Sequence, residues 1–533
     1  MSIEERDRTR IINYIDGLLN QDSTEEEALN EQQKIAIRRI CEAHAPPIRN
    51  TNQPQSTLEE FIREDTSLIT LPLIPDIPVR HQMYDSYIII GPPGTGKTTV
   101  IALGAIKYVL DPPSGHRRSR RTKIIVCTFS NAAAARIFEK FQEIFEEGLN
   151  YHQYGGFCRR LIAQTRDVQR IPERQRSYIL RPYPEDPRMA QNHRRDLENT
   201  LIYVGTLYAC ETLNRNGINT NQVIFDEGSQ ITPPQLYYPI SRNSNVIRVG
   251  LVGDNCQLPP IQEISLLSFS GIDYLRGQTI RNFGNSLIRE ENQIVLNYQY
   301  RMHPAIRELA MRFSVEEGRI LNDGFNVLRD EHLLQNFVPI GSGEPYSDVI
   351  NNIFNPQKTV VIIDTSELGH VAEDEFEELS RINLLEIRII QNLLTMLGER
   401  YPDLQINNEN IKLISPYRAQ ADSLQEVTNI LSGTADKFQG QESPIVFLSM
   451  TFADYDSSSS FLADLRRLNV ALSRAQRKLV IIGNQSRMNH RLFRRIRSEI
   501  FNYTYQGPPT LDYDPVYNLD LDVNIYNQLF PQI

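Results

Sequence analysis

Residues 91–99 read Gly91-Pro92-Pro93-Gly94-Thr95-Gly96-Lys97-Thr98-Thr99, and this stretch decides the fold. The apolar run Tyr87-Ile88-Ile89-Ile90 precedes it, and Val100-Ile101-Ala102-Leu103 follows it. A strand, a glycine-rich loop and a helix start, in that order, are the setting in which this spacing indicates a phosphate-binding loop. An ordinary Gly/Pro turn between a strand and a helix is the alternative, and the filled positions and correct flanks disfavour it.

Each residue type in this loop has a chemical reason. The glycines let backbone N–H groups turn toward a phosphate, and the helix that begins near Lys97 directs the positive end of its dipole to the same point. Lys97 is then expected to reach the β- and γ-phosphates, and the Thr98 hydroxyl is expected to bind Mg²⁺. We therefore expect the loop to bind ATP together with Mg²⁺.

Length and composition fit a large enzyme of the cytoplasm or nucleus. The chain has 533 residues, of which 40% are hydrophobic and 23% charged, so two or three domains are expected. No run of about 18 apolar residues occurs, and the N-terminus MSIEERDRTR has no hydrophobic signal region, so we expect a soluble protein with no membrane partner.

The cysteines and the net charge are less specific. The five cysteines are scattered singly, which argues for reduced thiols and against structural zinc; they are Cys41, Cys127, Cys158, Cys210 and Cys256. The net charge of −10 would repel nucleic acid if it were spread evenly, so the local distribution of charge decides that question.

Polar residues follow the apolar strands of the first half. Strands are expected at 123–127, 201–205 and 248–253, and Gln222–Phe225 is followed by Asp226 and Glu227. We expect Asp226 to hold Mg²⁺ and Glu227 to take the proton from the water that attacks the γ-phosphate. Simple edge charges are the alternative, and the complete phosphate loop upstream disfavours it. Gln257, after the strand at 248–253, is expected to contact the γ-phosphate.

The second half repeats the alternation without a second phosphate loop. Strands at 359–364, 412–415, 445–450 and 479–483 alternate with helices near 377–398, 417–432, 467–475 and 489–499, which predicts a parallel doubly wound sheet. This half supplies arginines in YRMHP and RRLNVALSRA, at 300–304 and 466–475. A guanidinium brought across a cleft neutralises charge on the transferred phosphoryl group and is worth roughly 10³–10⁵ in rate in other NTPases.

Three segments depart from the alternation. Residues 44–85 carry six prolines and are expected to form an irregular insertion, and the basic run at 116–123 is either a solvated loop or a phosphate-tracking segment. Residues 148–199 mix arginines with aromatic residues, which suits a surface that touches nucleic acid, the alternative being an ordinary helical insertion. We expect an N-terminal helix in residues 1–28, domains at 29–298 and 299–500, and an irregular tail at 501–533 that packs on the body or binds a protein partner.

Ten motifs in order resemble superfamily 1 group B helicases, the type that includes the nonsense-mediated-decay RNA helicase. They lie between about residues 29 and 483 and read LNEQQ, GPPGTGKTT, CTFSNAAA, YVGTLYA, FDEGSQ, GDNCQLPP, YQYRMHP, SPYRAQ, ADKFQGQE and RRLNVALSRA. The resemblance implies two RecA-like domains, ATP hydrolysis with Mg²⁺, binding of single-stranded RNA or DNA, and 5′→3′ movement.

The resemblance also implies roles for individual residues. Gln33 matches the adenine reader, Tyr300 the residue that stacks on adenine, and Glu442 the ribose contact. Arg301 and Arg474 match the arginines that reach the γ-phosphate. The motifs that hold the nucleic-acid strand are matched by Ser130, Asn131, Thr206, Pro416, Tyr417 and Thr434.

Two departures from the family pattern concern unwinding rather than ATP hydrolysis. Only 32 residues precede Gln33, where relatives usually carry a β-barrel on a stalk, and the cysteine/histidine-rich zinc module is absent. The expectation is therefore an ATP-dependent helicase or translocase that acts as a monomer. The alternatives are an ATPase that remodels nucleoprotein with little unwinding, and a non-catalytic nucleic-acid-binding scaffold.

Overall fold

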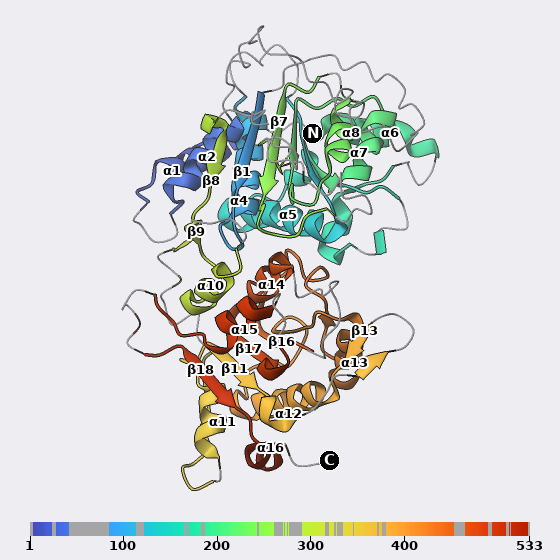
Figure 1. Ribbon diagram of the computed structural model, residues 1–533. Coiled ribbons are helices and arrows are strands. Elements are labelled where there is room, and N and C mark those ends of the chain that lie inside the picture. The colour runs from blue at the N-terminus through green and yellow to red at the C-terminus, as the bar shows by residue number, and fades with distance from the viewer. Residues whose placement is uncertain are drawn as a thin grey trace, which may run out of the picture.

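The computed structural model gives the architecture of two lobes that lie one above the other in Figure 1. The residues that it describes are 4–23, 28–41, 85–112, 122–164, 168–169, 171–182, 187–241, 243, 245–260, 270, 272–273, 276, 290–314, 319–324, 327, 334–344, 346–369, 373–375, 380–451, 464–488, 493–507, 511 and 513–530. The prolines of the 44–85 insertion and most of the basic run at 116–123 lie outside these residues.

The first lobe is built on an eight-stranded parallel sheet. Its order is β4-β3-β5-β2-β6-β7-β1-β8. The strands are β1 (Asp85–Ile90), β2 (Ile124–Thr128), β3 (Cys158–Leu161), β4 (Ile179–Leu180), β5 (Ile202–Thr206), β6 (Gln222–Phe225), β7 (Arg248–Gly253) and β8 (Gln293–Val295).

Both faces of this sheet are buried, which explains why its strands read as continuous apolar runs. Ile89 and Val126 face a core formed with helices α1, α2, α4 and α5, whereas Ile88 and Ile125 face a second core on the other side, beside α7 and α8. The helices are α1 (Glu5–Asn20), α2 (Glu31–Cys41), α4 (Lys97–Leu110), α5 (Asn131–Glu143), α6 (Ala190–Asn199), α7 (Cys210–Arg215) and α8 (Pro233–Ser241).

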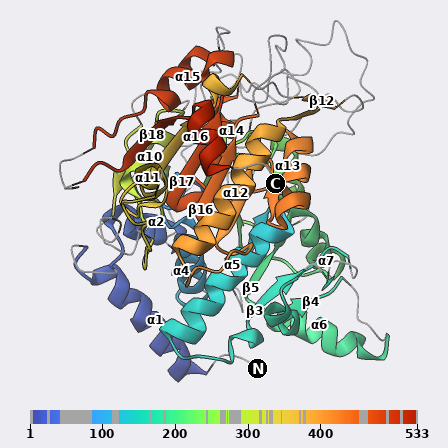
Figure 2. The same cartoon turned by 90° about the horizontal axis from the view of Figure 1, so that it is seen from below.

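The N-terminal segment forms an amphipathic helix, α1, over Glu5–Asn20. α1 buries Ile11, Ile15 and Leu19, which recur at helical spacing, and it packs against α4. Figure 2 shows α1 at the lower left of the view, beside the end of α5.

The second lobe contains a six-stranded parallel sheet of order β15-β14-β16-β17-β11-β18. Val360 and Ile362 face one core and Val361 and Ile363 the other, so this sheet too is doubly wound. Its elements are α10 (Pro304–Met311), α11 (Ser347–Phe354), β11 (Val360–Asp364), α12 (Leu384–Arg400), β14 (Ile411–Ile414), α13 (Arg418–Thr428), β15 (Ser432–Gly433), β16 (Ser443–Ser449), α14 (Leu465–Leu472), β17 (Ala475–Gly483), α15 (Arg494–Phe501), β18 (Val516–Asp520) and α16 (Val523–Leu529).

The α/β fold class with two tandem doubly wound parallel sheets is thus confirmed. Small two-stranded pairs, β9 (Tyr298–Gln299) with β10 (Asn322–Asp323) and β12 (Glu373–Glu375) with β13 (Ser380–Ile382), lie outside the main sheets.

Two sequence expectations about the extra segments are wrong. The 148–199 segment is not only helical, because β3 and β4 extend the first sheet, and its aromatics Tyr154 and Phe157 are buried in an aromatic cluster with Phe145. The 501–533 tail is not irregular, because β18 pairs along β11 and α16 follows it. Both errors arise because β3, β4 and β18 are short strands that carry too few residues to show a pattern.

A buried arginine anchors α2 to the first sheet. The Arg248 guanidinium donates to the carbonyls of Ile40 (3.0 Å) and Arg39 (2.6 Å) at the end of α2, and it pairs with Asp85 at 3.0 Å. We expect Arg248→Met to cost about 3 kcal/mol, because it leaves a buried carboxylate without its main cation. The thermal midpoint should fall by roughly 8 °C, measured by calorimetry. A midpoint within about 2 °C of the wild type would contradict this anchoring role.

Candidate nucleotide site

The phosphate loop connects β1 to α4 at the carboxyl end of the first sheet. Gly94 has φ +78°, and a Cβ there would lie 2.6 Å from the Cβ of Arg301, so only glycine fits between the loop and the following lobe. Thr95 Oγ1 donates to the Pro92 carbonyl at 2.9 Å, while Lys97 Nζ bends back to the carbonyls of Gly91 (2.6 Å) and Pro92 (3.2 Å). The remaining predicted positions are Pro93 and Gly96 in the loop and Thr98 and Thr99 in the first turn of α4.

The two predicted carboxylates follow β6, in the same lobe as Lys97. Asp226 is 6% exposed, and its Oδ1 has no hydrogen-bond partner among the residues that the structure describes. Burial, reinforced by the charge of Glu227, raises the pKa of Asp226 to about 7. A buried carboxylate oxygen left without a partner suits a cation, so Asp226 and the Thr98 hydroxyl fit the proposed Mg²⁺.

Glu227 adopts a backbone conformation that is rare for its type. Its φ is +57°, a conformation that costs on the order of 1–3 kcal/mol. Two backbone hydrogen bonds of 2.8 Å stabilise it. Gln230 N donates to the Glu227 carbonyl, and Gly228 N donates to the Val252 carbonyl. Burial lowers the pKa of Lys97, and the carboxylates Asp254, Glu227 and Asp226 oppose that shift. Lys97 and the acids therefore share one electrostatic environment.

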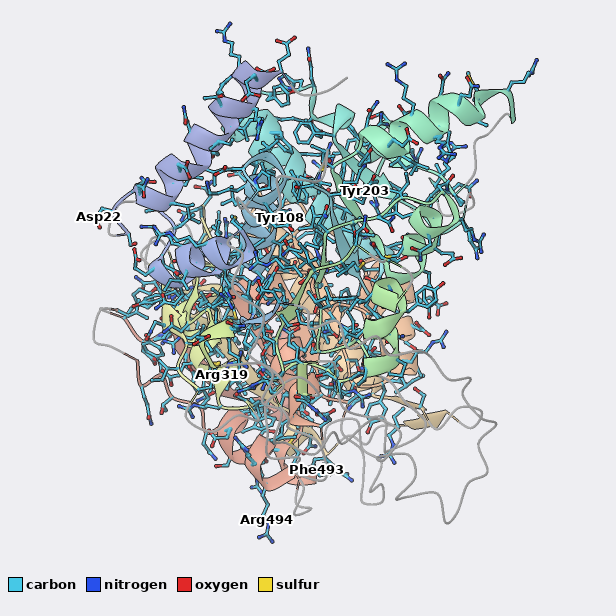
Figure 3. The ribbon with its side chains drawn as sticks, turned by 90° about the horizontal axis from the view of Figure 1, so that it is seen from above. Asp22, Tyr108, Tyr203, Arg319, Phe493 and Arg494 are labelled. Carbon is cyan, nitrogen blue, oxygen red and sulfur yellow. The ribbon has the colours of Figure 1, made fainter. Side chains whose placement is uncertain are left out.

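Gln257 lies in a polar network that sequence reasoning identified only in part. Gln257 Nε2 donates to Asp254 Oδ2 at 3.1 Å, and Asp254 Oδ1 pairs with Arg319 at 2.6 Å. Both members of this ion pair are buried; Arg319 is labelled in Figure 3. Gln439 of the second lobe donates to Gln257 Oε1 at 3.5 Å. The loop that carries Gln257 is therefore tied to the second lobe.

The predicted adenine contacts come together beside the phosphate loop. Gln33, 5% exposed, donates through Nε2 to the Thr95 carbonyl at 3.0 Å, and the Tyr300 N–H donates to the Gly94 carbonyl at 2.9 Å. Asn30, which sequence reasoning missed, links them: its Oδ1 accepts from Gln33 N (2.9 Å) and its Nδ2 donates to the Tyr300 hydroxyl (2.7 Å). A helix-capping Asn before Gln33 was the available signal.

The two predicted arginines come from the second half of the chain. Arg301 forms an ion pair with Glu442, which also accepts from Gln476 at 3.0 Å. Arg474 is 1% exposed, and its guanidinium donates to the carbonyls of Val470 (2.8 Å) and Gln441 (3.0 Å). Burial lowers the pKa of Arg474 to about 9, so it stays charged at neutral pH.

The charges of these arginines act on groups of the first lobe. Burial has the largest effect on the pKa of Lys97 and lowers it. The charge of Arg301 lowers this pKa further, whereas the three carboxylates raise it. Glu227 opposes the burial that lowers the pKa of Arg474. Arg301 therefore lies within electrostatic range of Lys97, and Arg474 within electrostatic range of Glu227.

The predicted nucleic-acid residues of the first lobe lie at the ends of two paired strands. Thr206 ends β5, level with Thr128 of β2, and Ser130 caps α5 by accepting from Ala133 N at 3.1 Å, directly before Asn131. Sequence reasoning assigned no role to two aromatics beside them: Phe129 is 44% exposed and Tyr208 is 66% exposed. Exposed aromatic rings next to these residues form a surface suited to stacked bases.

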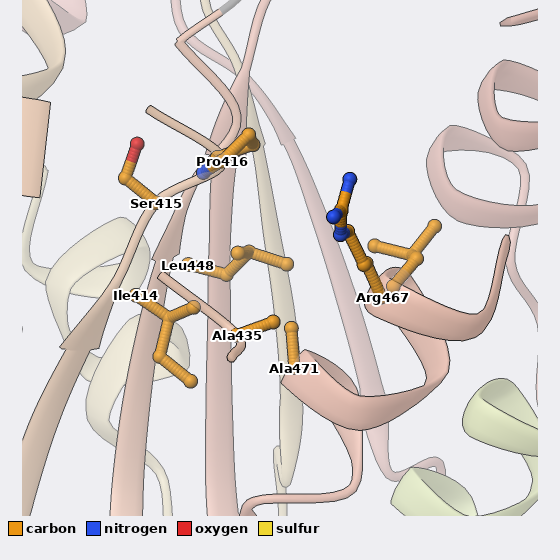
Figure 4. A pocket seen from close by; sticks show the side chains of 8 residues that line it. Ile414, Ser415, Pro416, Ala435, Leu448, Arg467 and Ala471 are labelled. Carbon is orange, nitrogen blue, oxygen red and sulfur yellow. The ribbon is translucent and has the colours of Figure 1, made fainter. Parts of the chain in front are cut away.

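The second lobe repeats this arrangement. Pro416 and Tyr417 follow β14, and Thr434 follows the neighbouring β15. Figure 4 shows Pro416 at a pocket of about 10 Å³ that Arg467 of α14 also lines.

None of the helices in the described ranges is both long and apolar enough to cross a bilayer.

Comparisons with known proteins agree with these features. Two family models match, each described as an AAA domain, one at residues 79–263 and one at residues 281–486. Helicase sen1 of Schizosaccharomyces pombe is 29% identical over 52% of this chain and 16% of its own length. DNA polymerase alpha-associated DNA helicase A of Saccharomyces cerevisiae is 26% identical over 75% of this chain and 62% of its own. The regulator of nonsense transcripts 1 homolog of Drosophila melanogaster is 25% identical over 78% of this chain and 35% of its own length.

The chain spans less than two thirds of the length of each of these curated relatives. The matched segments nonetheless cover both lobes, and two of these three relatives are named as helicases. Through both of its lobes, this chain is similar to superfamily 1 helicases.

Proposed function

We propose that this chain is an ATP-dependent helicase or translocase that moves 5′→3′ along single-stranded RNA or DNA. One observation carries the proposal: the segment with Tyr300 and Arg301 lies directly against the phosphate loop, where the Tyr300 N–H donates to the Gly94 carbonyl at 2.9 Å and a Cβ at Gly94 would lie 2.6 Å from the Arg301 Cβ. Hydrolysis then needs both lobes, and a cycle of closing and reopening supplies movement.

The proposed reaction is attack of water on the γ-phosphorus of ATP. A new P–O bond forms from the water, the bond to the bridging β,γ-oxygen breaks, and Glu227 takes the proton that the water loses. Lys97 holds the β- and γ-phosphates, and Arg301 and Arg474 neutralise charge on the transferred group. Gln257 positions the water or the γ-phosphate.

Mg²⁺, when bound, supplies Lewis-acid polarisation of the phosphate oxygens, with Thr98 and Asp226 as its protein ligands. Gln33 and Tyr300 contact the adenine and Glu442 the ribose. For Glu442 to reach the ribose, its ion pair with Arg301 must open, which also frees Arg301 to face the phosphates.

Experiments can distinguish this proposal from two alternative functions. An ATPase that remodels nucleoprotein hydrolyses ATP yet separates duplexes poorly. A non-catalytic scaffold binds nucleic acid without turnover, and the buried Arg474, on which the charge of Glu227 acts, argues against it.

Steady-state phosphate release with and without poly(U) or oligo(dT) tests the proposal, with Glu227→Gln as the inactive reference. We expect ATP turnover that rises with nucleic acid. Strand displacement on duplexes with 5′ or 3′ tails tests direction, and unwinding only of the 5′-tailed duplex is expected. If the wild type turns over ATP no faster than Glu227→Gln, the chain is a non-catalytic scaffold. If it turns over ATP without displacing a strand, it is an ATPase that remodels nucleoprotein.

Phe129 and Tyr208 supply a separate test of the nucleic-acid face. Base stacking is worth about 1–3 kcal/mol per base, so Phe129→Ala and Tyr208→Ala should each weaken oligo(dT) binding about tenfold in a fluorescence-anisotropy titration at fixed salt. Tyr208→Phe, which retains the ring, serves as control. Equal affinity of both alanine variants and the wild type would exclude these rings from the binding face.

We further propose that the chain acts as a monomer in the cytoplasm or nucleus, with any protein partner bound through its insertions or tail. Light scattering with and without nucleic acid measures the molar mass and so tests whether the chain is a monomer. A concentration-dependent dimer would overturn it.

A further inference from the structure

The turn Phe438–Glu442, here called the 438–442 loop, contacts the hydrolytic groups along its length. The carbonyls of Phe438 and Gln441 accept from Arg474 Nη1 at 3.4 and 3.0 Å. Gln439 donates to Gln257 at 3.5 Å, and Glu442 pairs with Arg301. The position of this loop therefore sets the position of both arginines.

Gly440, at the centre of the loop, lies against an arginine of the first lobe. A Cβ at Gly440 would lie 2.7 Å from Cζ and 2.9 Å from Nη1 of Arg136. Gly440 also has φ +74°, a conformation that other L-residues avoid. Arg136 belongs to α5, so its guanidinium packs on the loop backbone across the cleft.

Arg136 is not held by the fold in any other way within the described ranges. Its guanidinium makes no hydrogen bond or ion pair with any residue that the structure describes there. Its charge also acts on the second lobe, because it adds to the burial that lowers the pKa of Arg474.

The helix that carries Arg136 begins at the proposed nucleic-acid contacts. Ser130 caps α5 and Asn131 is its first residue. The Asn131 carbonyl accepts from the fully buried Arg160 at 2.8 Å, which fixes the start of the helix to β3. A helix moves as a rigid element, so a shift imposed at Ser130 and Asn131 is transmitted to Arg136.

We propose that Arg136 is a positioning residue that couples nucleic-acid binding at the start of α5 to the placement of Arg301 and Arg474, by holding the 438–442 loop against the first lobe. The inference rests on the proposed function and adds the route by which nucleic acid stimulates hydrolysis. Figure 1 shows α5 and α14 on the facing sides of the two lobes, as this route requires.

Arg136→Ala tests the coupling through kcat, the KM for ATP and the Kd for oligo(dT), measured on the full chain. Coupling between sites is typically worth 5- to 150-fold, so the kcat at saturating oligo(dT) should fall about tenfold. The KM for ATP and the Kd for oligo(dT) should stay within about twofold, because Arg136 touches neither ligand in this proposal. Arg136→Lys should restore part of the loss, since it keeps the charge without the planar group.

Lys140→Ala is the matched control, because Lys140 lies one turn further along α5 and pairs with Glu143. It should leave the stimulated kcat unchanged. If Arg136→Ala is stimulated as fully as the wild type, the coupling role is overturned. If instead its Kd for oligo(dT) rises tenfold while kcat at saturation is intact, Arg136 is a nucleic-acid contact and the coupling role is again overturned.

Gly440→Ala provides an independent check should Arg136→Ala fail to fold. The added methyl group collides with the Arg136 guanidinium, so stimulation should fall in Gly440→Ala alone. Where Arg136→Ala folds, the double variant should lose less stimulation than the sum of the two single losses. Strictly additive losses would contradict the contact. A wild type that hydrolyses ATP at the same rate with and without nucleic acid would overturn the proposed function itself, which separates that failure from failure of this inference.

Discussion

Arg474→Ala is expected to lower the kcat for ATP by about 10³-fold while ATP binding changes by less than about threefold. Arginines that neutralise charge on the transferred phosphoryl group are worth roughly 10³–10⁵ in rate, and they act in the transition state rather than on bound ATP. Burial lowers the pKa of Arg474 only to about 9, so the group is charged when the enzyme works at neutral pH. Phosphate release gives kcat, and titration with a fluorescent ATP analogue gives binding.

The matched control is Arg466→Ala in α14, the helix that ends shortly before Arg474, since Arg466 is 35% exposed and pairs with Asp464. Its turnover should remain within about twofold of the wild type, the range of ordinary surface substitutions. Because Arg474 also supports the 438–442 loop, Arg301→Ala serves as a second variant that spares those carbonyl contacts. Wild-type turnover in both Arg301→Ala and Arg474→Ala would remove the role of the second lobe in hydrolysis.

Glu227→Gln is expected to reduce turnover about 10³-fold, within the range of 10²–10⁴ that general-base catalysis contributes. The amide keeps the size and shape of the side chain but cannot take a proton from water. The left-handed backbone at Glu227 is unaffected by the exchange, so the variant should fold and bind ATP as the wild type does.

A single-turnover assay with excess enzyme isolates this chemical step from product release. Glu198→Gln is the control, because Glu198 lies on α6, where it is 52% exposed and pairs with Arg194. Loss of turnover below tenfold in Glu227→Gln would assign the base to another group.

The sequence predicted those parts of the site whose chemistry is local in the chain. The phosphate loop follows an apolar strand and opens a helix within a few residues, and Asp226 and Glu227 directly follow β6. Strands buried on both faces are nearly continuous apolar runs, so most central strands were placed within about two residues. β17 begins at Ala475 rather than at residue 479, because its first residues are polar.

The parts that the sequence did not predict depend on pairs that only the fold brings together. Asn30 contacts Tyr300, Asp254 pairs with Arg319, and Arg136 packs on Gly440. The sequence around each of these residues does not indicate which distant residue it contacts. The solvent exposure of aromatic residues was also not predictable from the sequence. Tyr154 was expected to face nucleic acid and is buried, whereas Phe129 and Tyr208 lie on the surface.

The central claim is that guanidinium groups from the second lobe complete a triphosphate site on the first. A structure of the chain with ADP, aluminium fluoride, Mg²⁺ and a single-stranded oligonucleotide tests this claim most directly. We predict that Arg301 leaves Glu442, and that both Arg301 and Arg474 lie about 3 Å from the fluoride ligands that stand for the transferred phosphoryl oxygens. If Arg301 stays on Glu442 and Arg474 stays on the carbonyls of Val470 and Gln441 with the nucleotide bound, the account is contradicted.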